Sequence, residues 1–401
     1  MRDLIRPAPM REFDVGERTA TWLELFFDLC FVAAIAALAD GLHADPTLQG
    51  LWHFGALFVP VWWVWMQFTW FATAWDNDDV LHRLGMLVAM LLVIVLAAGI
   101  PRVHEQRDGL FVTAYAGLQV VLVLMFARVL PHAGSARRFA RNYMLGDAVG
   151  GLIMLSSLLV DPPLRYWVWA LALLVLMAAP AFAVRAYEGQ PFDSRHIPER
   201  YGLFTIIVLG ESVVVVAARL GDVALDGGAI ASALLGFGIA AAIWWTYFET
   251  MTAAALAREH LGAAFLWGYG QFFAFSGIAA TAVGVELAIV DAAEGHGLDV
   301  ASRLAICAGP AAFLFSLAAI HRVTASGWDR VLTERGIAIT LLVGIALLGE
   351  GLGPIVLVGS VLAIFVVTAA LDIRHTAHTP GMQTEAAPSE AEPPIDANAP
   401  L

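Results

Sequence analysis

Residues 22–40 read WLELFFDLCFVAAIAALAD. This stretch is long and apolar enough to cross a lipid bilayer, because a spanning helix needs about 17–25 residues. It nevertheless contains two carboxylates, Glu24 and Asp28. Insertion scales assign about 2.5–3.5 kcal/mol to an acidic residue at the centre of a membrane helix, so such a residue is a candidate for function. Because the two acids are spaced i, i+4, they share one helix face.

The composition of the whole chain indicates the same class of protein. Hydrophobic residues make up 60% of the sequence and charged residues 14%, whereas soluble domains are about 45–50% apolar and about 25% charged. The mean hydropathy is +0.75. A membrane β-barrel would show short alternating segments instead of long apolar runs. We therefore expect an all-α polytopic membrane protein.

Long apolar segments follow one another along the chain and predict about 12 transmembrane helices. The segment at 262–290 contains several glycines, so we expect it to tilt or break. The segments are 22–40, 51–71, 84–100, 109–128, 142–160, 164–184, 201–219, 229–249, 262–290, 302–320, 336–350 and 353–371.

The arginines predict the orientation. All 22 basic residues are arginines, and seventeen of them fall on one side of the predicted membrane if the N-terminus lies inside. Basic residues are enriched in cytoplasmic loops, so we expect both termini in the cytoplasm and a multi-pass protein of the bacterial inner membrane. No cleavable signal peptide is visible before the first apolar segment, which we expect to remain as an anchor.

Similar features recur in the two halves of the chain. Glu199 and Arg200 precede the seventh segment as Glu17 and Arg18 precede the first, and tryptophan pairs stand at 62–63 and 244–245. We expect two parallel six-helix repeats, since six is an even number of crossings. The expected parts are a cytoplasmic arm at 1–20, repeats at 21–190 and 191–374, and a disordered acidic, Pro/Ala-rich tail at 375–401.

The carboxylates of the first segment allow two interpretations. Close, buried acids disfavour full ionisation, which suits a proton carrier, and an ionised pair suits a cation site. Alternatively, the acids have a structural role and bond to Arg18, to Arg200 or to a tryptophan indole.

The seventh segment contains Glu211 and Ser212 directly after a glycine. If the halves are related by pseudo-symmetry, we expect Asp28 and Glu211 to face each other and to form one ion or proton site, with Ser212 as a hydroxyl donor. The expected supporting residues are Arg18, Glu199, Arg200, Tyr201 and Glu249.

Other patterns exclude several functions. The net charge of −13 and the lack of a basic patch argue against nucleic-acid binding. The acidic run at 76–79 is expected to cap the third helix rather than to bind a metal. Asp147, Glu286 and Glu350 are further acids in or beside apolar segments. The sequence has no zinc-protease, serine-hydrolase or P-loop signature, so we expect neither an enzyme nor a cofactor.

Three of these stretches together resemble a known family. The stretches at 24–28 (ELFFD), 199–202 (ERYG) and 209–212 (LGES) are similar to those of the bacterial low-temperature-requirement A membrane family. The resemblance covers roughly residues 15–375. It implies a polytopic membrane protein associated with growth in the cold, and it implies no particular reaction.

The stretch around Asp28 also resembles the Phe-Ser-Asp motif of an atypical potassium channel family. Those channels are built from six-helix units, and their first helix lines the pore. Here Phe27 replaces the serine, so the resemblance does not extend to ion selectivity.

The leading hypothesis is a transporter or channel for H⁺, Na⁺ or K⁺ with an intramembrane carboxylate site. The alternative is a membrane protein that supports growth in the cold through contacts with lipids or partners, without transport.

Overall fold

The computed structural model describes residues 10, 19–75, 78–187, 196–222, 227–250, 261–295, 298, 300–324 and 328–377. Within these ranges the chain forms 12 α-helices and three short 3₁₀ turns, η1 to η3. The helices are α1 (Trp22–Ala44), α2 (Leu48–Ala74), α3 (Val80–His104), α4 (Gly109–Val129), α5 (Arg137–Ser156), α6 (Leu164–Arg185), α7 (His196–Asp222), α8 (Gly227–Thr250), α9 (Leu261–Glu294), α10 (Val300–Thr324), α11 (Arg330–Leu348) and α12 (Pro354–Ala377).

Each predicted apolar segment coincides with one of these helices over most of its length, so the predicted all-α architecture is confirmed. Several helices begin earlier than the apolar segments because a polar side chain caps the first turn. Asp79 accepts a hydrogen bond from the His82 amide at 3.0 Å and starts α3, and Asp329 does the same for Leu332 and α11. The predicted capping role of the acidic run is therefore confirmed for Asp79, whereas residues 76 and 77 lie outside the described residues.

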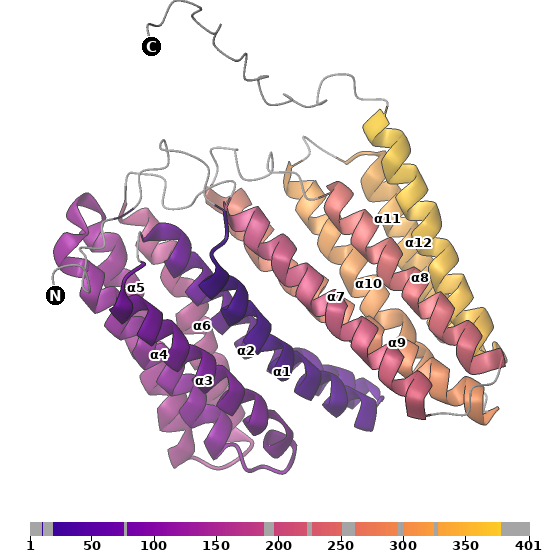
Figure 1. Cartoon of the computed structure of the whole chain (residues 1–401), viewed down its shortest axis with the longest axis horizontal. Coiled ribbons are helices and arrows are strands. Elements are labelled where there is room, and N and C mark those ends of the chain that lie inside the picture. The colour runs from indigo at the N-terminus through magenta and orange to yellow at the C-terminus, as the bar shows by residue number, and fades with distance from the viewer. Residues whose placement is uncertain are drawn as a thin grey trace, which may run out of the picture.

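The helices α1 to α6 and α7 to α12 form two neighbouring groups, and α1 and α7 meet between them (Figure 1). Eleven of the helices in the described ranges are long and apolar enough to cross a membrane. Large apolar side chains remain exposed on many of them, for example Leu87 and Leu91 on α3. Such surfaces are stable against lipid tails, so the chain is a multi-pass membrane protein.

The helix α2 is not among these eleven helices, because its tryptophan, glutamine and threonine residues lower its mean hydropathy. It is instead surrounded by protein, and every residue from Pro60 to Ala74 is buried. The indoles of Trp62, Trp63 and Trp65 are among the largest fully buried side chains. These tryptophans therefore face a packed interior and not the lipid.

The segment at 262–290, which was expected to tilt or break, does not break, because α9 is one continuous helix of 34 residues. Its glycines serve close packing instead. A Cβ added to Gly277 would lie 2.7 Å from the carbonyl oxygen of Gly309 on α10. Small residues allow membrane helices to approach closely, and this packing joins α9 to α10.

Replacing Gly277 with alanine is expected to lower the thermal stability of the purified protein, at a cost of about 1–3 kcal/mol for overpacking. Gly344→Ala is the matched control, since an added Cβ there meets nothing within 4 Å. That variant should unfold at the wild-type temperature or above it, because alanine favours helix. Equal losses in both variants, measured by thermal unfolding in detergent, would contradict the proposed α9–α10 contact.

Candidate functional site

The first turn of α1 fixes the position of Glu24. Thr21 is the N-cap residue: its hydroxyl accepts from the Glu24 amide at 3.3 Å. In return the Glu24 carboxylate accepts from the Thr21 amide at 2.8 Å. This reciprocal arrangement is a capping box. It orients Glu24 and places Asp28 one helical turn further along the same face.

Asp28 lies at the centre of a buried ion network. Its Oδ1 accepts from the Arg200 guanidinium at 2.5 Å and from the Trp65 indole at 2.8 Å. A second guanidinium nitrogen of Arg200 lies 3.3 Å from Glu24 Oε1. The exposed fractions of Asp28, Arg200 and Glu24 are 0%, 1% and 2%. One arginine from α7 is therefore held between two acids from α1.

The start of α7 adds a histidine to this network. His196 Nε2 lies 3.8 Å from Glu24 Oε2, and His196 Nδ1 lies 3.1 Å from the hydroxyl of Thr73 on α2. We call Glu24, Asp28, Trp65, His196 and Arg200 the seam cluster, because it joins α1, α2 and α7 where the two groups of helices meet. It combines three titratable side chains with one permanent cation.

Aromatic rings surround the seam cluster. The Trp65 ring stacks on Phe204 at a centroid distance of 4.2 Å and meets the edge of Tyr201 at 4.9 Å. The Tyr201 hydroxyl accepts from the Trp70 indole at 3.3 Å. These rings limit the access of water, so the electrostatic interactions inside the cluster are stronger than they would be in solvent.

The seam cluster places two buried carboxylates, Glu24 and Asp28, against the guanidinium of Arg200. Within the described part of the chain, Asp28 Oδ2 has no hydrogen-bond partner. That oxygen can accept a proton or bind a cation, because a buried acceptor that lacks a partner is costly.

Several predicted residues do meet at this place. Glu24, Asp28 and Arg200 form the core of the cluster. Tyr201 is part of its aromatic wall, and Glu199 accepts from the amide of residue 20 at 3.1 Å. Arg18 lies outside the described residues. The contacts of Asp28 with an arginine and an indole are also those that the structural interpretation expected.

The structure does not bring Glu211 to Asp28. Arg200, and not Glu211, is level with Asp28, and Glu211 follows about 16 Å further along α7, given a rise of 1.5 Å per residue. The expected site shared by Asp28 and Glu211 is thus not formed. Glu249 is also elsewhere, exposed at the last turn of α8.

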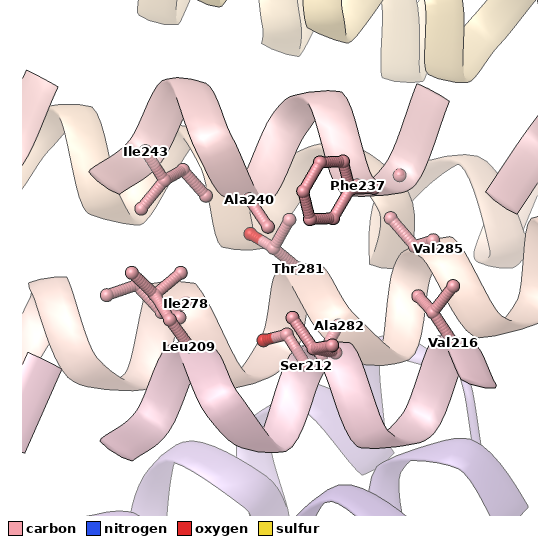
Figure 2. A pocket seen from close by; sticks show the side chains of 12 residues that line it. Leu209, Ser212, Val216, Phe237, Ala240, Ile243, Ile278, Thr281, Ala282 and Val285 are labelled. Atoms are coloured by element: carbon pink, nitrogen blue, oxygen red, sulfur yellow. The ribbon is translucent and has the colours of Figure 1, made fainter. Parts of the chain in front are cut away.

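Ser212 lies in a hollow of about 40 Å³ between α7, α8 and α9 (Figure 2). The lining is mainly apolar and includes Phe237. The Ser212 hydroxyl donates to the Val208 carbonyl oxygen at 3.4 Å. The nearby Thr281 hydroxyl donates in the same way to Gly277 at 2.7 Å. With both hydroxyls bonded within their own helices, the hollow suits an apolar group better than an ion.

A second ion pair lies at the opposite end of α7. Arg219 pairs with Glu286 of α9, and His43 near the end of α1 lies 3.4 Å from the same carboxylate. Ionisable side chains therefore connect α1 to α7 directly at the start of both helices and through Glu286 of α9 near their ends. The sequence showed Glu286 as an acid in an apolar segment but did not indicate its partners, which come from distant parts of the chain.

Thr21 and Thr73 were not among the predicted site residues. Thr21 could have been found, because Thr followed three residues later by Glu is the signature of a capping box. No sequence pattern marks Thr73, whose contact with His196 joins residues 123 positions apart.

Comparison with known proteins agrees with this architecture. Residues 19–370 match the model of the bacterial low temperature requirement A protein (LtrA) family. The chain belongs to the LtrA family. It is also 27% identical, over 331 residues, to an uncharacterized protein of Rhizobium meliloti (strain 1021), covering 79% of this chain and 80% of that protein. No solved structure matches it significantly.

Removing the positive charge of the seam cluster should destabilise the protein. Arg200→Gln is expected to lower the free energy of unfolding by about 3–5 kcal/mol, because the buried carboxylate of Asp28 then loses its guanidinium partner. Adding Glu24→Gln and Asp28→Asn to Arg200→Gln should recover most of this loss. The measurement is thermal unfolding of the purified protein in detergent.

The control is Arg83→Gln, since Arg83 pairs with Asp78 on the exposed surface at 2.9 Å, where ion pairs contribute little. A triple variant as unstable as Arg200→Gln alone would show that charge balance is not what Arg200 provides.

Proposed function

We propose that this LtrA family protein moves protons or small monovalent cations, H⁺, Na⁺ or K⁺, across the membrane, and that the seam cluster is the binding site. The observation that supports this most is the arrangement of two buried carboxylates around one guanidinium. The second carboxylate oxygen of Asp28 has no hydrogen-bond partner within the described residues, so it can accept a proton or bind a monovalent cation. Acids inside membrane proteins commonly mark ion or proton pathways.

In this proposal Arg200 acts as a tethered competitor of the transported ion. A proton or cation that binds to Asp28 or Glu24 weakens their attraction to Arg200. Because α1 carries the acids and α7 the arginine, this exchange loosens the contact between the two helices. His196 can take part, since an imidazole ring can bind and release a proton and this one lies beside Glu24.

The position of the cluster also supports the proposal. The α1–α7 contact lies between the two groups of helices (Figure 1), and the Arg219–Glu286 pair lies near its other end. Movement of one group against the other would change both ends of this contact. Alternating access by relative movement of two halves is a common mechanism among transporters.

We further propose that the two groups are parallel repeats and that both termini face the bacterial cytoplasm. The packing supports a repeat: α1 packs on α3 as α7 packs on α9. The tryptophan pairs, however, differ in surroundings, since Trp62 and Trp63 are buried while Trp244 and Trp245 are each 46% exposed. The arginine distribution supports the orientation.

Ion flux into proteoliposomes tests the proposal. Potassium, sodium and proton gradients are imposed in turn on wild type, Asp28→Asn and Glu24→Gln. We expect flux in wild type and a flux at least about tenfold lower in both variants. A loss of about 1.4 kcal/mol in ion or proton binding is enough to lower the binding constant tenfold.

Asp108→Asn is the matched control. Asp108 is also buried and paired with an arginine, Arg165 at 2.9 Å, but it joins α4 to α6 away from the seam cluster. This variant should transport normally when equal amounts of folded protein are reconstituted. Normal flux in Asp28→Asn would show that Asp28 is not the ion site. If wild type moves none of the three ions, the alternative of a non-transporting protein that acts through lipid or partner contacts gains weight.

A further inference from the structure

A second buried polar network lies within the first group of helices, away from the seam cluster. Gln67 of α2 and Gln119 of α4 exchange hydrogen bonds at 3.2 and 2.9 Å. The Gln67 amide also donates to Asp147 of α5 at 2.7 Å. The exposed fractions of Gln67, Gln119 and Asp147 are 5%, 1% and 1%. We call these three residues the glutamine–aspartate cluster.

Asp147 has no cationic partner within the described residues. The arginines nearest to the ends of the surrounding helices are engaged elsewhere, Arg128 with Asp79 and Arg165 with Asp108. Arg141 precedes Asp147 by about 9 Å along α5 and lines an open hollow at the start of that helix. An ionised Asp147 would therefore be a single negative charge surrounded by protein, at a cost of several kcal/mol.

Two tyrosines complete the surroundings of Asp147. Tyr115 precedes Gln119 by one helical turn on α4, and Tyr143 precedes Asp147 by one turn on α5, so each shares a helix face with a member of the cluster. Both rings are buried. The hydroxyls of Tyr115 and Tyr143 and the second carboxylate oxygen of Asp147 have no hydrogen-bond partner in the described part of the chain.

Tight packing at this level favours a proton over a metal cation. A Cβ added to Gly151 of α5 would lie only 2.8 Å from the Cβ of Gln119, so α4 and α5 are in close contact. Each glutamine oxygen already accepts a hydrogen bond from the other amide. A metal cation requires a shell of several oxygen ligands, whereas a proton requires one oxygen atom.

We propose that Asp147 is a proton-binding site that is distinct from the seam cluster. In this proposal the proton resides on Oδ2, which has no partner among the described residues, while Oδ1 accepts the hydrogen bond from Gln67. Loss of the proton leaves a carboxylate that attracts the Gln67 amide more strongly. Because Gln67 and Trp65 stand on the same helix, α2 links this site to the carboxylate of Asp28.

The first test is infrared spectroscopy of the full-length protein at neutral pH, with aspartate carrying a ¹³C label at its carboxyl group. We expect the carbonyl band of a protonated carboxylic acid, shifted by the label, and a decrease of this band by the contribution of one carboxyl group in Asp147→Asn. The band should persist in Glu24→Gln/Asp28→Asn, which removes the acids of the seam cluster. Absence of a label-shifted band in that double variant would overturn the proposal, even if Asp147→Asn does not fold.

The pH dependence of unfolding provides a second measurement. Aspartate in an unfolded chain is ionised above about pH 4, so folding would have to take up a proton at Asp147. As the pH rises from 5 to 8, the equilibrium constant for folding of wild type should therefore fall about tenfold per pH unit relative to that of Asp147→Asn. Parallel curves for the two proteins would contradict the proposal. Neither measurement requires transport, so the result is independent of the function proposed for the seam cluster.

Discussion

The burial of one guanidinium between two carboxylates is the constraint on which much of this structure depends. Arg200 is 1% exposed, and an arginine in the membrane interior is stable only with partners. Asp28 and Glu24 provide those partners. In this structure these ion pairs hold the first turns of α1 and α7 side by side, and this contact joins the two groups of helices.

The helix α2 explains how two polar networks coexist in an apolar protein. Successive residues of a helix turn by about 100°, so Trp65 and Gln67 point to nearly opposite sides of α2. One side bonds to Asp28 and the other to Asp147. Polar groups on both sides make α2 unsuited to contact lipid, and the bundle encloses it. The same arrangement means that a change in one network can reach the other through a single rigid helix.

The candidate site was predictable in part. The acids of α1 stood out because charge inside an apolar run is costly, and their common face followed from their spacing. Arg200 was one of several possible partners, because a sequence lists the charges near a helix end without showing which of them meet. Glu211 was placed with Asp28 by analogy between the halves. Tertiary packing shifted the contact by about three helical turns along α7, to Arg200.

The sequence alone determined the class of the protein and the number, order and approximate limits of its helices. Those properties depend on local apolar length and on capping, which neighbouring residues control. Only the tertiary structure decided that α2 is enclosed, that Arg200 meets Asp28, and that Gln67, Gln119 and Asp147 converge. Such contacts join residues 52 to 172 positions apart. They depend on how whole helices pack against one another, which no local pattern specifies.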